Sequence, residues 1–216
     1  MKKLIAIVSS LFLVSIISAK AEIGIGVSGA YHMIEGDGSE TTRTSNQKNN
    51  GTHDEDVAVP EVFIEAVADN GFAFGFSYIP TRDLGSKSRS DSNSEGDTGT
   101  YKAAAELDDV MKIYVDIPLS GFNVFGGQGY ISAGVQHVTI STLESLNSGS
   151  AYPNKDLFGS SIGVGLKGDL PYGGLYYKGE FTYTAFEEYE AVSDAGNKVI
   201  ADLDNYTGRL SIGYKF

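Results

Sequence analysis

The sequence predicts an all-β fold, an eight-stranded antiparallel up-and-down transmembrane β-barrel. Three observations predict it: period-two stretches recur eight times, their connectors alternate between long and short, and each stretch has one apolar and one small or charged face. The expected strands cover residues 22–33, 57–68, 72–80, 101–117, 129–141, 157–168, 174–186 and 205–216. No stretch after residue 21 has a convincing helical period.

The first 21 residues have the pattern of a cleaved signal peptide. Lys2 and Lys3 precede an apolar run at 4–17, and Ala-Lys-Ala at 19–21 is a small-x-small cleavage site. A retained membrane anchor is the alternative, but an anchor needs about 20 apolar residues in a row. We therefore expect a signal peptide at 1–21, export from the cytoplasm, and a single barrel domain at 22–216.

Each expected strand alternates bulky apolar residues with small or charged ones. The bulky face carries Phe72, Phe74, Phe76, Tyr78, Met111, Ile113, Phe158, Ile162, Val164, Leu175, Tyr177, Phe181, Leu210, Ile212, Tyr214 and Phe216. The opposite face carries Gly24, Gly26, Ser28, Gly75, Lys112, Asp116, Gly163, Gly165, Lys178, Glu180 and Arg209. Such alternation is typical of strands whose two faces meet different surroundings.

The connectors are unequal in a regular way. Those at 35–56, 81–100 and 187–204 are long, polar and rich in Ser, Asn, Gly and acidic residues. The short set includes the hairpin signal Asp69-Asn70-Gly71, the turn at 169–173, and the less regular segment 118–128. Long loops at one end and short turns at the other are typical of transmembrane barrels.

The orientation of the apolar face separates two kinds of barrel. A soluble barrel of the lipocalin type would point it inward, but eight strands leave an interior only just wide enough for side chains. The end of the chain favours the membrane: Leu210, Ile212, Tyr214 and Phe216 alternate up to the last residue. We therefore expect the apolar face to contact lipid and the glycine-rich face to line the lumen.

A charge-balanced lumen follows from that orientation. The inward face carries five acids and five bases: Glu61, Glu65, Asp108, Asp116 and Glu180, with Lys112, Lys167, Lys178, Arg209 and Lys215. Buried charges need partners. We expect a Glu180–Arg209 pair between the last two strands, with Lys112 and Glu61 in the same network; contact of each charge with trapped water is the alternative.

The formal net charge of −12 falls mainly on the long loops, and loss of the leader removes three lysines and makes the chain more acidic. This charge argues against a nucleic-acid partner, because phosphate binding needs a basic face. An acidic outer rim could hold divalent cations that bridge lipopolysaccharide, or the loops could simply be solvated. With no cysteine, a disulfide or thiolate metal site is excluded.

Candidate catalytic motifs are weak. The two GxGxxG matches, at 24–29 and 163–168, lie inside strands and lack the helix that would hold a phosphate. His32 lies near an outer rim, and His137 stands near Thr139 and Ser141, but neither has a recognisable third group to orient a base. No histidines share metal-ligand spacing. We therefore expect no enzyme, no metal and no cofactor.

The leader, the eight alternating strands and the final segment 206–216 together resemble the small eight-stranded bacterial outer-membrane proteins of the OmpA/OmpX-like and opacity-protein (porin-family) class. The resemblance implies an outer-membrane location, contact with lipid and lipopolysaccharide, and an assembly signal at Leu210, Ile212, Tyr214 and Phe216 that the barrel assembly machinery reads. It also implies a role in envelope integrity or adhesion through surface ligands at the long loops.

Two alternatives stay open beside that role. The first is a narrow pore or small-solute transporter; the second, less favoured, is an outer-membrane enzyme acting on lipid A. A lumen filled by paired charges favours the structural role, because eight strands leave little room for a channel. We expect a monomer, since a closed barrel has no free edge that needs a partner strand.

Overall fold

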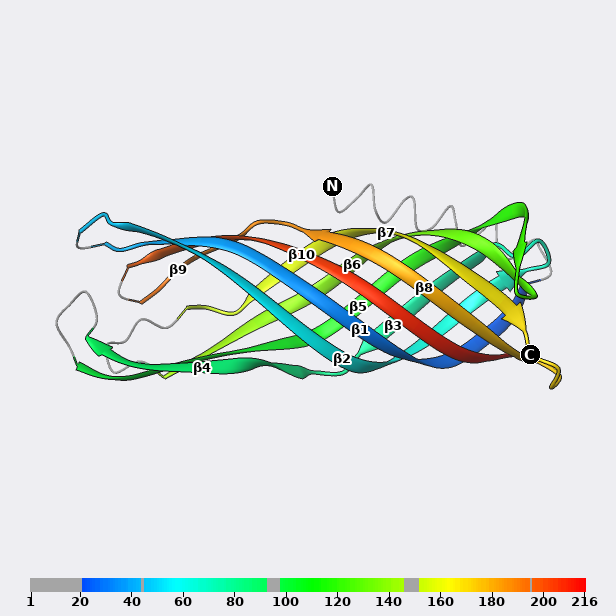
Figure 1. Cartoon of the computed structure of the whole chain (residues 1–216), viewed down its shortest axis with the longest axis horizontal. Coiled ribbons are helices and arrows are strands. Elements are labelled where there is room, and N and C mark those ends of the chain that lie inside the picture. Colours follow the sequence, from blue (N-terminus) through cyan, green and yellow to red (C-terminus); the bar gives the residue numbers. More distant parts are fainter. Residues whose placement is uncertain (1–20, 44, 93–97, 146–151, 195) are drawn as a thin grey trace.

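The computed structural model describes residues 21–216 except 44, 93–97, 146–151 and 195. Every regular element in this part of the chain is a strand (Figure 1). The strands are β1 (Ala21–Thr41), β2 (Lys48–Ala68), β3 (Ala73–Ile79), β4 (Arg82–Ser92), β5 (Thr98–Val124), β6 (Gly127–Ser145), β7 (Lys155–Asp169), β8 (Leu175–Phe186), β9 (Tyr189–Val192) and β10 (Lys198–Lys215). The described residues contain no helix long and apolar enough to cross a membrane.

The strands form one antiparallel sheet that closes on itself. Its order is β1-β2-β3-β5-β6-β7-β8-β10, and β10 returns to pair with β1. β3 and β4 both pair with β5, and β8 and β9 both pair with β10, so ten strand segments fill eight positions around the ring. The predicted eight-stranded up-and-down barrel is confirmed.

The two ends of the barrel chain meet at the closing seam. The register of β1 and β10 runs from Gly24 opposite Lys215 to Thr41 opposite Lys198. Ile23 and Phe216 then exchange both backbone hydrogen bonds, at 3.2 and 3.0 Å. The final residue is thus part of the barrel wall.

The outer wall is an apolar belt, as the alternation predicts. Exposed large side chains come from every strand of the ring; examples are Val27, Ile64, Phe76, Ile113, Val135, Ile162, Phe181 and Ile212. Burying such a belt in water-free surroundings is what makes a barrel stable in lipid. The soluble alternative, with this face pointing inward, is therefore wrong for this chain.

The long connectors were predicted as loops, and this is largely wrong. β1 and β2 stay paired through most of 35–56, from Glu35 opposite Asp54 to Thr41 opposite Lys48. Strand structure also extends into 81–100 and 187–204 as β4, β9 and the ends of β5 and β10. The reason is that both faces of the β1–β2 extension carry polar residues, so apolar alternation could not reveal it. In 187–204 the alternating residues Val199, Ala201 and Leu203, which pack inside the barrel, were a signal that the prediction missed.

The segment 118–128, predicted as an irregular short connector, is mostly strand. β5 continues to Val124, and the pairing with β6 shifts register between Pro118 and Asn123. The extra residues on the β5 side form a bulge, and Gly121 within it has a φ of +82°. A bulge bends its strand, and glycine accepts the left-handed conformation that this bend requires.

One seam of the wall is paired only in its inner part, nearest the short turns. β2 pairs with β3 from Val67 opposite Ala73 up to Val62 opposite Tyr78. β3 then ends, Pro80 and Thr81 follow, and β4 pairs with β5 alone. Residues 48–61 of β2 thus have β1 on one side and no strand of the described chain on the other, and Figure 1 shows β2 and β4 diverging.

Candidate functional site

The inward face of the barrel brings ionisable side chains from opposite walls together at mid-height. Strand alternation and register point Glu61 and Glu65 of β2, Lys112 and Asp116 of β5, and Lys178 and Glu180 of β8 into the lumen. All six are buried, with exposed fractions from 0% for Asp116 to 8% for Glu180. With Arg209 of β10, we call these seven residues the charged waist.

Arg209 connects two carboxylates. It stands directly opposite Glu180 in the β8–β10 ladder, and its Nη1 donates to Glu180. Its Nε donates to Glu61 Oε2 at 2.7 Å. β1 separates β10 from β2, but its inward residues here are Ser28 and Ala30, whose short side chains let the guanidinium reach across. A guanidinium suits this place because it binds two partners with a rigid fork of donors.

Glu180 is the centre of the upper part of the waist. Lys112 Nζ reaches it from the opposite wall at 3.6 Å. Tyr130 and Thr182 donate hydroxyl hydrogen bonds to it at 3.1 and 2.9 Å. The structure therefore places Glu61, Lys112, Glu180 and Arg209 in one connected cluster.

A second cluster lies beside the first and was not anticipated as a group. Lys178 Nζ donates to Glu65 Oε2 at 2.8 Å and to Asp116 Oδ2 at 2.7 Å. Tyr114 also donates to Glu65, at 2.9 Å. All of these atoms are buried, so the pairing compensates for the loss of hydration that burial imposes on each charge. Sequence alternation identified the inward direction of these charges but not which of them meet.

Aromatic rings fill the space left between the charges. Tyr114 lies against Gly75, and Tyr130 against Gly165, so closely that an added Cβ would sit 2.2 and 2.3 Å from the ring carbons. The ammonium of Lys178 lies 4.7 Å from the centre of the Tyr114 ring. The cavity among the waist residues has a volume of about 10 Å³, which is room for about one water molecule. The waist is thus a packed plug.

Two other inward charges, Lys167 and Lys215, lie at the inner end of the barrel. Lys215 contacts Asp169 at 2.8 Å and Glu22 at 3.7 Å near the short turns. Lys167 Nζ reaches the carbonyl of Gly71 at 3.4 Å. Asp108 was predicted to point inward, and this is wrong: the bulge at 109–110 reverses the alternation, so Asp108 stands opposite the outward-facing Thr139 and accepts a hydrogen bond from Ser141 at 2.7 Å. These residues are only half-buried and do not join the waist.

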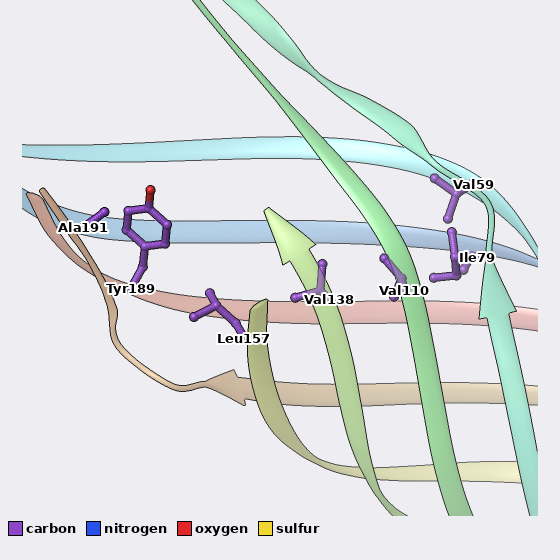
Figure 2. Packing of buried hydrophobic residues seen from close by; sticks show 8 residues of the cluster. Val59, Ile79, Val110, Val138, Leu157, Tyr189 and Ala191 are labelled. Carbon is purple, nitrogen blue, oxygen red and sulfur yellow. The ribbon is translucent and has the colours of Figure 1, made fainter. Parts of the chain in front are cut away.

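Above the waist the lumen contains an apolar cluster, which the sequence analysis missed, beside buried polar side chains such as His32, Thr184 and Asn205. The buried side chains of this cluster line what we call the outer lumen: Ala30, Val59, Ile79, Val110, Val138, Leu157, Tyr189 and Ala191. Figure 2 shows the side chains of β2, β3, β5, β6 and β7 converging, with Tyr189 and Ala191 of β9 beside them. The sequence did contain a signal for this cluster: by strand alternation, Val59, Val138 and Leu157 fall on the same face as the lumen charges.

The candidate catalytic histidines have partners of other kinds. His32 is buried, and its Nδ1 lies 3.0 Å from the Asn205 amide nitrogen and 3.1 Å from the Thr207 hydroxyl. His137 lies on the outer face, 3.8 Å from Asp156, and Thr139 donates to Asp156 instead of to the histidine.

Metal-binding geometry is also missing from the described part of the chain: no three His, Asp or Glu side chains there converge as ligands.

The predicted assembly signal lies on the outer face of the last strand. All four of its side chains are exposed, and Leu210 is 75% exposed; they are Leu210, Ile212, Tyr214 and Phe216.

No family model matches the chain, and no curated protein resembles it in sequence. Its structure is similar to that of the outer membrane protein OprG from Pseudomonas aeruginosa, with a TM-score of 0.54, 18% identity, and coverage of 92% of this chain and 97% of OprG. It is also similar to the outer membrane protein AlkL, with a TM-score of 0.51, 12% identity, and coverage of 92% and 91%. The chain therefore has the fold of a small outer-membrane β-barrel.

Proposed function

We propose that the protein is an integral outer-membrane barrel with a structural, envelope-integrity or surface-interaction role, closed to ions and hydrophilic solutes at its waist. The packed charges carry this proposal, because moving an ion through them would require separating buried pairs such as Lys178–Asp116, at 2.7 Å. The strands that extend beyond the apolar belt give the protein a large polar outer surface for ligands.

The same proposal includes its route to the membrane. A cleaved leader at 1–21 directs export, and the exposed row Leu210, Ile212, Tyr214 and Phe216 is the signal for the barrel assembly machinery. Lipid and lipopolysaccharide then surround the apolar belt, and the closed ring lets the protein act as a monomer. Divalent cations at the acidic outer surface, bridging lipopolysaccharide, belong to this proposal as well. We assign the protein no catalytic activity: the Thr207 hydroxyl lies 3.1 Å from His32 Nδ1, but both side chains are buried inside the barrel, and His32 Nε2 has no partner among the described residues.

Planar-bilayer conductance of the refolded protein tests the closed waist. Insertion is verified separately by the heat-dependent gel shift of folded barrels. We expect no ion conductance from the wild-type protein. We expect channel openings from Arg209→Ala/Glu180→Ala, which removes the central pair while keeping the charge balance. Steady openings of the wild-type protein would contradict the proposal.

A second function is supported by the outer lumen. Its apolar lining meets the wall where β2 has no pairing strand on one side among the described residues: Val59 lies in the unpaired part of β2, and Ile79 ends β3. We propose, as the alternative to a purely structural role, that small apolar molecules enter from outside and leave sideways into the lipid without crossing the waist. Apolar contacts would favour such solutes over ions.

Uptake of an apolar fluorescent dye by cells that produce the protein tests this second function. Faster uptake with the wild-type protein, reduced by Leu157→Trp and unchanged by the similarly bulky outward change Ile162→Trp, would support it. Equal uptake with and without the protein would leave only the structural role. The conductance result is independent, because this route bypasses the waist.

A further inference from the structure

The outer part of β2 is an open strand edge in water. Residues 48–56 lie beyond the apolar belt, since the outward residues Asp54 and Asp56 follow Ala58 and Pro60 toward the outside. One side of this segment pairs with β1, from Lys48 opposite Thr41 to Asp56 opposite Met33. The other side has no partner strand among the described residues.

An open edge exposes backbone hydrogen-bonding groups at alternate residues. Each strand bonds its two neighbours through alternate N–H and C=O groups, so about half of those in 48–56 point away from β1. Open edges are templates for another strand, and proteins commonly protect them with charges or proline. Pro60 lacks an N–H and marks the inner limit of this edge.

Acidic side chains gather at the inner end of this edge, beyond the uncharged residues 49–52 and Lys48 at its outer end. Asp54, Glu55 and Asp56 are consecutive, and Glu35 of β1 is directly opposite Asp54. On its other side Glu35 is directly opposite Asp204 of β10, so three carboxylates share one row across three strands. Like charges directly opposite each other in a sheet are unfavourable.

This charge selects the partner. Two copies of the chain meeting edge to edge would bring the acidic segment 54–56 against itself, so repulsion disfavours self-association. A strand with basic side chains would instead relieve the repulsion within the row. Backbone pairing provides affinity in such strand addition, and side chains at alternate positions provide selectivity.

We propose that residues 48–58 of β2 bind an extended, basic peptide segment of another protein by β-strand addition outside the cell. The proposal rests on the surface-interaction role and names the partner class for it. Lysine or arginine at positions i and i+2 of the added strand would lie on the outer face beside Asp54 and Asp56. The closed inner seam between β2 and β3 keeps this edge fixed in position.

A peptide pair tests the backbone and the charge separately. The probe is a ten-residue peptide that alternates lysine and threonine, added to the full-length mature protein in lipid nanodiscs. The control peptide has the same sequence and charge. It carries N-methyl groups at alternate residues, on the edge that would pair with β2. Loss of several backbone hydrogen bonds should weaken binding at least about tenfold.

Matched variants of the protein complete the test. Asp54→Asn/Asp56→Asn should weaken binding of the unmethylated peptide by several-fold, because two facing charges are removed. Glu187→Gln/Glu188→Gln removes two exposed acids elsewhere and should leave the affinity unchanged. Backbone amides of 48–58 should also gain protection from hydrogen exchange when the peptide is bound.

Three results would overturn the proposal: equal affinity for the methylated peptide, equal loss in both protein variants, or no binding at all. The first two would mean nonspecific attraction to a net negative protein. If the protein conducts no current in the planar bilayer and also binds no peptide, the proposal of a basic peptide partner fails while the closed-waist barrel stands. The two failures are therefore distinguishable.

Discussion

The inner and outer parts of β2 differ although they belong to one continuous strand. From Val62 to Val67 the strand has a neighbour on both sides, and its inward side chains Glu65 and Phe63 pack in the filled waist. From Lys48 to Glu61 it has β1 alone. The lumen changes at nearly the same height, from paired charges to the apolar cluster around Val59 and Leu157.

The difference reflects what surrounds each part. In the hydrocarbon region an unpaired backbone group costs several kcal/mol, so the ring must be complete there. At the outer margin of the belt and beyond it, water can satisfy the free edge, so the chain tolerates a break at Pro80. Charges in the lumen are tolerated for the opposite reason, because each is enclosed by partners. The inner part is therefore a rigid plug, and the outer part carries the interaction surfaces.

Removal of the central cation should have the largest effect. Arg209→Met leaves Glu61 and Glu180 buried without their main partner and should lower the free energy of unfolding by about 3–5 kcal/mol. Urea unfolding of the refolded protein in lipid vesicles measures this. The matched change Lys198→Met breaks a half-exposed pair of the outer part with Glu190 at 2.7 Å and should lower the stability far less, because solvent screens exposed pairs. Equal losses of unfolding free energy in the two variants would contradict the difference between the inner and outer parts.

A double-mutant cycle sharpens the assignment of the central pair. Glu180→Gln and Arg209→Gln alter two groups in direct contact, so their effects should be non-additive by about 1–3 kcal/mol. Unfolding free energies of the two single variants and the double variant give this coupling. Additive effects would mean that each charge is stabilised by water and not by its neighbour.

Two glycines on the same sheet should respond differently to an added methyl group. In Gly75→Ala the new Cβ would meet the Tyr114 ring at 2.2 Å, which should destabilise the protein by about 1–3 kcal/mol. In Gly51→Ala, on the open edge, nothing lies within 4 Å of the new atom, so stability should stay within about 0.5 kcal/mol. A large effect of Gly51→Ala would show that the edge is covered.

Acid should loosen only the tip of the outer part. The Lys198 ammonium donates a hydrogen bond to Glu190 and lowers the pKa of that carboxyl below its ordinary value of 4.5. The stabilising contact is thus present above pH 4.5 and is lost as the pH falls through the lowered pKa. NMR signals of β9 should shift in that acidic range, whereas Glu190→Gln should abolish the dependence. An unchanged titration in that variant would assign the effect to another group.

The fold was readable from the sequence because strand alternation and connector length are local signals. The Phe72–Tyr78 stretch and the terminal Leu210–Phe216 stretch each reveal their lipid face without further information. The inward direction of Glu180 and Arg209 follows from the same alternation, and their adjacency follows from the order of the strands.

What the sequence could not provide depends on the tilt and stagger of the strands. Lys178 reaches Glu65 and Asp116 across the lumen, and no local pattern fixes that height. The polar extensions of β1 and β2 lack an apolar face, so they resembled loops. The open seam had one overlooked signal, Pro60 in the middle of a strand, because proline is expected at an edge.

Hydrogen exchange along β2 tests the contrast most directly. The account predicts that backbone amides at 62–67 of the protein in lipid are all protected, whereas protection alternates at 48–59: amides that face β1 are slow to exchange and those that face away are fast. Continuous protection from 48 through 67 would show that another strand covers the outer part of β2, and would contradict both the open seam and the binding edge.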